Sequence, residues 1–246
     1  MTDELRETLL RRYGDTQARI ANPGVYDDVK APWSYYDANY AAVVAELDPK
    51  ARIAEIGSGS GSLLAWLRAR GFSDLHGVDA SPADVEFANG HLEPGVVTLG
   101  DAASYLDERA ASFDAVFAKA IVEHIPRQDL LRLLRALSRS LRPGGRLIVD
   151  VPNMDWILAS HERYMDLTHE NGFTMESLST YLALEFEDVR VTGSRLATPS
   201  GSQRLLRPVV LLLLRRLLYF VGEGASDVLF SSRSLIAVAR APRPAA

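Results

Sequence analysis

The sequence predicts an α/β fold in which seven strands form a mostly parallel sheet, with helices on both faces and the last strand antiparallel. Two observations predict it. From about residue 52 onward, short apolar runs alternate with amphipathic stretches, which is the pattern of βα units. Most of the apolar runs end in Gly, Asp or Pro, and ligands gather at such strand ends in parallel sheets.

Each expected element follows from a short stretch of sequence. The strands are expected at residues 52–56, 74–78, 96–99, 113–118, 145–151, 186–192 and 234–239. Helices are expected at 62–70, 82–89, 128–141 and 175–184. Ser81 and Pro82 fit an N-cap and a first helical turn, and Gly144 and Gly145 fit a helix stop. Residues 153–172 are polar and predict an irregular loop.

Two parts of the chain differ in character. Residues 1–50 predict an N-terminal helical cap or lid over the carboxyl edge of the sheet, and they include the aromatic residues Tyr26, Trp33, Tyr35, Tyr36 and Tyr40. Residues 51–246 predict the main domain, with a helical insertion at about 195–232. A chain of 246 residues that is 47% hydrophobic is sufficient for one large core.

Composition excludes several classes of protein. A net charge of -5 argues against a protein that mainly coats nucleic acid, because such binding neutralises phosphates with Lys and Arg. The chain has no cysteine, so it has no disulfides, thiolate nucleophile or thiolate metal ligands. Residues 1–12 lack the apolar stretch of a secretory signal. We therefore expect a cytoplasmic protein.

A glycine-rich turn marks the first candidate ligand site. Residues 55–61 read Glu-Ile-Gly-Ser-Gly-Ser-Gly, after a strand and before a helix. Glycines there permit a tight turn and let backbone N–H groups approach a ligand. A dinucleotide-binding turn would have glycine at position 62, where this chain has Ser62. The pattern favours a small molecule other than NAD.

Carboxylates follow the next two strands. Asp79 lies 22 residues after Gly57, where its oxygens can accept hydrogen bonds from ribose hydroxyls. Asp101 follows the third strand and can accept from an exocyclic adenine amine. Each feature also has a structural alternative, since glycine turns reverse the chain and Asp commonly caps helices.

The ordered motifs at 55–61, 77–79, 100–102, 113–116 and 141–145 resemble those of class I S-adenosylmethionine-dependent methyltransferases, over residues 52–153. The resemblance implies a Rossmann-like fold with S-adenosylmethionine as cofactor. It implies that the turn lies against the methionine part, that Asp79 binds the ribose and that Asp101 binds the adenine. The implied cofactor-binding residues are Glu55, Gly57, Ser58, Gly59, Gly61, Asp79, Ala80, Asp101 and Ala102.

Methyl transfer to a hydroxyl requires a base, and His124 is one candidate. It follows the fourth strand in a Glu123-His124 pair that resembles pairs in many methyltransferases with different acceptors, so a structural or cofactor-side role stays open. Such a pair also binds metals. Some ubiquinone-pathway O-methyltransferases carry another acid three residues before the Glu, where this chain has Ala120. We therefore expect no metal.

His169 is the second candidate base, with Asp166 placed to orient its imidazole. Residues 166–174 resemble a segment of bacterial methyltransferases of surface-polysaccharide and glycolipid assembly, which implies a sugar or glycolipid hydroxyl as acceptor and His169 as the base. The alternative is that Asp166, His169 and Thr174 only hold the loop together and cap the following helix.

The most apolar segment is 208–221, which contains Arg215 and Arg216 and is too short to span a membrane. Three placements stay open for it. The helix packs internally, forms a homodimer, or lies on a membrane surface through residues 204–222, where Arg204, Arg207, Arg215 and Arg216 would lie near anionic lipid.

The leading hypothesis is an O-methyltransferase for a sugar or glycolipid hydroxyl. Two alternatives are methylation of a small phenolic natural product, with the N-terminal aromatic residues as the acceptor pocket, and a non-catalytic scaffold that binds S-adenosylmethionine. A basic stripe of Arg132, Arg135, Arg139 and Arg142 is typical of a solvated helix face, so we expect a small-molecule or glycosyl partner and no nucleic acid.

Overall fold

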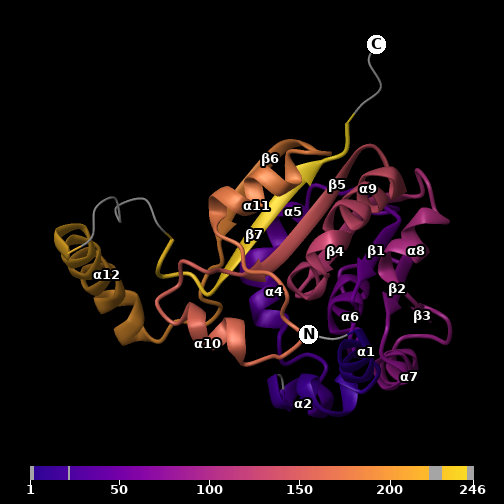
Figure 1. Cartoon of the computed structure of the whole chain (residues 1–246), viewed down its shortest axis with the longest axis horizontal. Coiled ribbons are helices and arrows are strands. Elements are labelled where there is room, and N and C mark those ends of the chain that lie inside the picture. The colour runs from indigo at the N-terminus through magenta and orange to yellow at the C-terminus, as the bar shows by residue number, and fades with distance from the viewer. Residues whose placement is uncertain (1–2, 22, 222–228, 243–246) are drawn as a thin grey trace.

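The protein is built around one seven-stranded sheet. The computed structural model describes residues 3–21, 23–221 and 229–242. The strand order is β3-β2-β1-β4-β5-β7-β6 (Figure 1), with β7 antiparallel between β5 and β6 and the other pairs parallel. This confirms the predicted sheet. Its strands are β1 Ile53–Ile56, β2 Leu75–Asp79, β3 Val97–Leu99, β4 Phe113–Lys119, β5 Leu141–Pro152, β6 Glu187–Gly193 and β7 Ser234–Arg240.

Helices cover both faces of the sheet, as predicted. Along β4, Val116 and Ala118 belong to one hydrophobic core while Ala115 and Phe117 belong to the other, because side chains alternate between faces. The first core contains α8 Ala102–Asp107, α9 Leu130–Ser140 and α11 Met175–Leu182, and the second contains α4 Trp33–Asn39, α5 Ala41–Val44, α6 Ser62–Arg68 and α7 Pro82–His91. Burial of each large apolar side chain stabilises the fold by about 1.5–3 kcal/mol.

Some predicted boundaries are wrong. The helix expected at 128–141 ends at Ser140, and Leu141 begins β5. Gly144 and Gly145 therefore lie inside the strand and do not stop the helix. The reason is strand pairing: Phe113 pairs with Leu141 and Ala115 with Arg146, so the intervening residues form an irregularity in β5.

Two short helices were not predicted. α8 follows Asp101, whose side chain accepts the backbone N–H of Ser104 as an N-cap. α10 Ala159–Tyr164 lies in the expected loop 153–172. In α10, Glu162 is buried and pairs with Arg233, with 2.9 Å between Oε1 and Nε. A helix of six residues is too short to show a periodic pattern, and the contact between α10 and Arg233 joins residues far apart in the chain.

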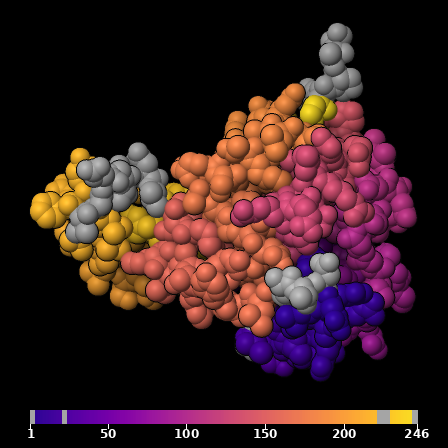
Figure 2. All heavy atoms as spheres, in the orientation of Figure 1, coloured from indigo at the N-terminus to yellow at the C-terminus, as the bar shows by residue number. Residues whose placement is uncertain are grey.

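The N-terminal and late segments flank this body. α1 Asp3–Arg11, α2 Gln17–Ala21 and α3 Pro23–Asp27 precede α4, which packs on a face of the sheet rather than over its edge. α12 Gly201–Val221 projects from the body (Figures 1 and 2) and forms the helix of the expected insertion 195–232. Residues 222–228 of that insertion and 243–246 lie outside the described residues.

Candidate active site

A cavity of about 860 Å³ lies at the carboxyl ends of β1 to β4. Tyr13 and Tyr26 line it from the N-terminal helices. The predicted residues that line it are Glu55, Gly57, Ser58, Gly59, Asp79, Ala80, Asp101, Ala102 and His124. The structure thus brings together nearly all of the residues predicted to bind the cofactor.

The glycine-rich turn is braced by Asp79. One carboxylate oxygen of Asp79 accepts the N–H of Gly59 at 2.7 Å, and the other accepts the N–H of Ser81 at 2.8 Å. Gly61 is not among the lining residues. Its φ is +73°, and a Cβ there would lie 2.9 Å from the Cβ of Ala88. Gly61 therefore allows α6 to begin against α7 instead of facing a ligand.

Buried polar atoms face the cavity without partners. The Oε2 of Glu55 and the Oγ of Ser58 have no hydrogen-bond partner among the described residues. Burial raises the pKa of Glu55 to about 8 and that of Asp79 to about 6. Unpaired buried acceptors are costly, so the site suits a ligand that brings donors. An amino-acid ammonium and ribose hydroxyls are such donors, and these residues fit S-adenosylmethionine.

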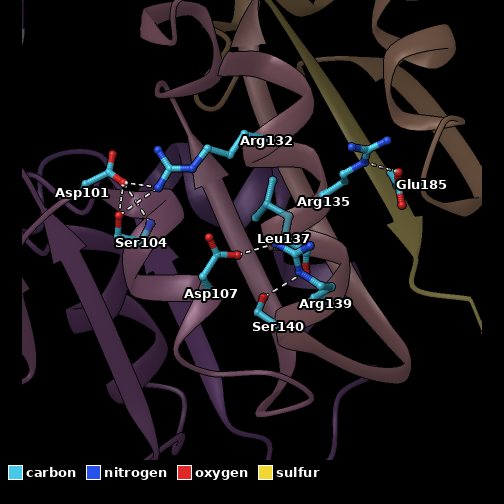
Figure 3. Close-up of polar contacts among 9 residues, drawn as sticks. All are labelled: Asp101, Ser104, Asp107, Arg132, Arg135, Leu137, Arg139, Ser140 and Glu185. Carbon is cyan, nitrogen blue, oxygen red and sulfur yellow. Dashed lines mark hydrogen bonds and ion pairs between the residues drawn. The ribbon is translucent and has the colours of Figure 1, made fainter. Parts of the chain in front are cut away.

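Asp101 is already engaged, but on one oxygen only (Figure 3). Its Oδ1 accepts the N–H of Ser104 at 2.9 Å and the hydroxyl of Ser104 at 2.8 Å, and it lies 3.6 Å from the Nη2 of Arg132. No hydrogen bond to its Oδ2 is recorded within the described residues. Helix capping and adenine binding are therefore compatible roles for this side chain.

Of the predicted basic stripe, Arg142 lies in β5 and pairs with Asp114 at 2.7 Å, and the three arginines on α9 are also held in ion pairs (Figure 3). Besides Arg132, Arg135 lies 3.2 Å from an oxygen of Glu185, and Arg139 lies 2.5 Å from one of Asp107. Exposed pairs of this kind contribute only about 0–1 kcal/mol each. The carboxylates neutralise the charge of these arginines, so α9 does not present a row of unpaired positive charges.

A second cavity of about 610 Å³ adjoins the first. It is lined by residues from segments far apart in the chain, including Tyr35, Asp150, Trp156, Glu162, Asp166, His169, Arg207 and Arg233. The two cavities share Tyr13, Pro32, Lys119, Ala120 and His124. A molecule in the second cavity therefore lies directly beside one in the first.

His124 is fixed in one tautomer by Thr168 and Asp166. The Oγ1 of Thr168 donates to the Oδ1 of Asp166 at 2.7 Å, so that hydroxyl can only accept from the Nδ1 of His124, 2.8 Å away. The lone pair of His124 is therefore on Nε2. Burial and the neighbouring His169 lower the pKa of His124 to about 4, which keeps it neutral.

His169 has a different partner from the predicted one. Its Nδ1 lies 2.8 Å from the backbone carbonyl of Glu162, which can only accept, so its Nε2 also carries a lone pair. The carboxylate of Asp166, predicted to orient and charge-stabilise this imidazole, bonds to other side chains in the structure, and only the backbone carbonyl of Asp166 accepts a hydrogen bond from His169, from its N–H at 3.3 Å. Asp166 accepts hydrogen bonds from Thr168 and from the hydroxyl of Tyr13, and it acts on His169 through its charge. Burial nevertheless lowers the pKa of His169.

Glu123 completes a cluster with the two imidazoles. Ligating atoms of Glu123, His124 and His169 lie within 4.8 Å of one another, and the Oε2 of Glu123 has no hydrogen-bond partner among the described residues. Two imidazoles and a carboxylate are a donor set that suits zinc. The sequence argument rested on Ala120 and missed His169, which folding brings to the same place. The prediction of no metal stays a prediction.

Lys119 was not among the predicted site residues. A lysine at the end of an apolar strand is nevertheless a recognisable sign of a functional position. Lys119 lines both cavities. Burial alone would lower the pKa of its ammonium group, but the phenol of Tyr36 and the carboxylates of Asp150 and Glu55 raise this pKa instead. Asp150 also accepts hydrogen bonds from the hydroxyls of Tyr35 and Tyr40.

Comparison with known proteins identifies the domain. Residues 54–149 match the family model described as Methyltransferase domain. A methyltransferase from Archaeoglobus fulgidus has a similar fold, with a TM-score of 0.63 at 22% identity over 87% of this chain and 94% of that one. Haemonchus contortus phosphoethanolamine N-methyltransferase 2, solved with S-adenosyl-L-methionine, gives 0.59 at 18% identity over 96% and 60%. Residues 54–149 are therefore similar to a methyltransferase domain, and most of the chain shares the fold of these S-adenosylmethionine-dependent methyltransferases.

Curated relatives differ in their substrates. Ubiquinone biosynthesis O-methyltransferase of Xanthomonas axonopodis pv. citri is 37% identical over 116 residues, covering 45% of this chain and 47% of that protein. Trans-aconitate 2-methyltransferase of Deinococcus radiodurans is 29% identical over 209 residues, covering 84% and 70%. The chain spans about half the length of relatives such as the ubiquinone-pathway enzyme, so substrate does not follow from these matches.

Proposed function

We propose that the protein transfers the methyl group of S-adenosylmethionine to a hydroxyl of a sugar or glycolipid. The observation that carries this proposal is the junction of the two cavities at Lys119 and His124, beside His169. The cofactor supplies an electrophilic methyl group. The second cavity supplies a space for the acceptor, lined by both apolar and polar side chains, and two neutral imidazoles with free lone pairs.

The residues of the first cavity bind the donor in this proposal. The positive charge of the bound ammonium group favours the ionised form of Glu55, whose unpaired Oε2 then accepts from that group. Asp79 accepts from the ribose hydroxyls while it braces the turn. Asp101 accepts from the adenine amine with its Oδ2. Residues 1–50 act as a cap, since Arg6 and Tyr13 line the cavity opposite the sheet. That cap excludes water from the reacting groups.

His169 serves as the base. Its Nε2 accepts the acceptor's proton, and the charge of Asp166 stabilises the imidazolium that results. His124 lies with its ring centroid 4.7 Å from that of His169 and forms the wall between the cavities. Its neutral, fixed imidazole positions the acceptor oxygen.

Several features support a glycosyl acceptor. The lining includes Lys119, Asp150, Glu162 and Arg233, which offer both donors and acceptors to a molecule rich in hydroxyls. The resemblance of residues 166–174 to methyltransferases of polysaccharide and glycolipid assembly favours the same class. The name of the ubiquinone-pathway relative, an O-methyltransferase, favours oxygen as the methylated atom. A lipid-linked acceptor would be reached through membrane contact of residues 204–222, and a homodimer is the competing proposal for that segment.

A phenolic acceptor has less support. Tyr36 and Tyr40 are buried in the core beside Trp66, and the hydroxyls of Tyr35 and Tyr40 bind Asp150. These aromatic side chains therefore serve packing, and only some face a cavity. A non-catalytic scaffold would bind the donor and turn over no acceptor.

The test has two stages. Calorimetric titration with S-adenosylmethionine and S-adenosylhomocysteine should show binding. If neither compound binds, the proposal is contradicted, because the reaction requires the donor. Donor carrying an isotopically labelled methyl group is then offered with glycolipids, free sugars and phenols. Labelling of the glycosyl panel alone is the expected result. Labelling of phenols alone would favour the alternative, and no labelling would favour the scaffold.

A further inference from the structure

α12 has two apolar sides, and only one of them packs on the body. Arg207, Leu211, Leu214 and Leu218 recur at helical spacing and are partly buried, so this side faces the protein. The other large apolar side chains up to residue 220 are each more than half exposed. They are Leu205, Leu206, Val209, Val210, Leu212, Leu213, Leu217, Tyr219 and Phe220.

This exposed surface is far more apolar than a soluble monomer ordinarily presents. A helix of 21 residues is about 30 Å long, and exposed leucines follow it from end to end. No helix in the described part of the chain is long and apolar enough to cross a membrane. The exposed apolar side chains run from Leu205 to Phe220, so a partner that covers them would lie along the helix.

The charges of α12 indicate what that partner is. The helix carries Arg204, Arg207, Arg215 and Arg216 and no acidic residue, in a protein of net charge -5. Within the described residues none of the four forms an ion pair, unlike the arginines of α9. Arg207 donates to the carbonyl of Ser231, and Arg215 lies over the ring of Phe230. Arg204 and Arg216 are thus exposed on the helix and have no ion-pair partner in the described part of the chain.

We propose that α12 binds the surface of an anionic phospholipid bilayer. Its exposed leucines enter the boundary between headgroups and acyl chains, and its exposed Arg204 and Arg216 pair with anionic headgroups. A second copy fits less well, because pairing two such helices would bring together eight arginines and no acid. A bilayer complements both the apolar surface and the charge.

This placement bears on the acceptor. Arg207, on the body-facing side of α12, lines the second cavity. A bilayer along the opposite side of the helix would lie close to that cavity, so the head of a lipid-linked acceptor could enter it. This last step rests on the proposed function, whereas bilayer binding by α12 does not.

The first experiment measures binding of the full chain to vesicles by flotation. We expect at least about tenfold tighter binding to phosphatidylcholine vesicles that contain phosphatidylglycerol than to phosphatidylcholine alone, weakening as salt is raised. Replacing Leu213→Glu together with Leu217→Glu should abolish binding. Leu131→Glu with Leu184→Glu, which changes exposed leucines outside α12, should not. Donor affinity measured on every variant reports folding and separates this result from failure of the proposed function.

A second experiment tests whether the side chain at position 213 of α12 enters the bilayer. Because the chain has no cysteine, Leu213→Cys accepts a single environment-sensitive fluorophore. Anionic vesicles should shift its emission to the blue, while the same label at Leu131→Cys should not respond. Absence of vesicle binding by the wild type would overturn the proposal. So would a dimer in light scattering that the Leu213→Glu, Leu217→Glu variant dissociates and that does not bind vesicles.

Discussion

The two cavities meet at one wall but are built differently. The first cavity, where we propose that the donor binds, is called the donor cavity, and its predicted residues come from short motifs that each follow a strand, in chain order from Glu55 to Asp101. The second cavity, where we propose that the acceptor binds, is called the acceptor cavity. Its lining comes from segments between Tyr13 and Ser234, joined by contacts such as Thr168 to His124 and Arg233 to Glu162. Under the proposed function, donor binding is thus a local property of the sequence, and acceptor binding is a property of the folded chain.

The largest effect should follow from His169→Ala. General base catalysis contributes about 10²–10⁴-fold, so turnover should fall by that amount while donor affinity stays unchanged. Turnover is measured with labelled donor and affinity by calorimetry. Intact turnover would mean that His169 only holds the loop, and equal losses in both quantities would mean that the two cavities are not separable.

Asp79→Ala should affect the other cavity. It removes an acceptor for the ribose and the brace of the Gly59 N–H, and hydrogen bonds to charged groups contribute about 1.5–3 kcal/mol each. Donor affinity should fall about 100-fold or more. Asp79→Asn is the matched control, since its amide oxygen preserves one acceptor and the loss should be smaller. Unchanged donor affinity in both variants would remove Asp79 from the binding site.

Asp166→Asn should change the pH profile as well as the rate. The neutral form of His169 is the base, so turnover falls as pH drops through its pKa, which burial holds below the ordinary value. The Asp166 charge raises this pKa, so removing it should move the acidic limb to lower pH. Asn keeps only one of the two oxygens that accept from Tyr13 and Thr168. Loss of one of these hydrogen bonds should also lower turnover by about tenfold. Thr168→Val, which keeps the charge, should lower turnover without this shift; an unmoved limb in Asp166→Asn would contradict the charge effect.

Glu55→Gln should change how stability depends on pH. The pKa of Glu55 is about 8 when folded and near 4.5 when unfolded, so between these values the folded state keeps a proton that the unfolded state has lost. Its contribution is fully present below pH 4.5 and is lost as pH rises to about 8, by a few kcal/mol at most. The melting temperature of the wild type relative to Glu55→Gln should fall over this window. A difference independent of pH would show that Glu55 is ionised when folded.

The smallest effect should come from chelation. If His124 and His169 handle protons, treatment with a chelator should leave turnover within about twofold, since no metal-bound water is required. Metal content and turnover are measured before and after treatment. Loss of turnover restored by a divalent ion, together with loss of ion binding in Glu123→Gln, would instead make this cluster a metal site.

The sequence predicts the donor cavity well because glycines and strand-end carboxylates have defined positions in a βα unit. Gly61 is the exception, since the sequence cannot show that Ala88 lies behind it. For the acceptor cavity, the sequence identified His124, Asp166 and His169 but not their partners. The relay from Asp166 through Thr168 to His124 depends on how the loop folds back, and periodic patterns carry no information on such contacts.

The shared wall of the two cavities divides the chain into exchangeable parts. Residues up to His124 form most of the donor cavity, and the segments after β5 supply much of the acceptor cavity, including Trp156, His169 and Arg207. Under the proposed function, grafting a different loop and helix after β5 would therefore alter which molecule is methylated. The machinery that holds the methyl donor would be inherited intact.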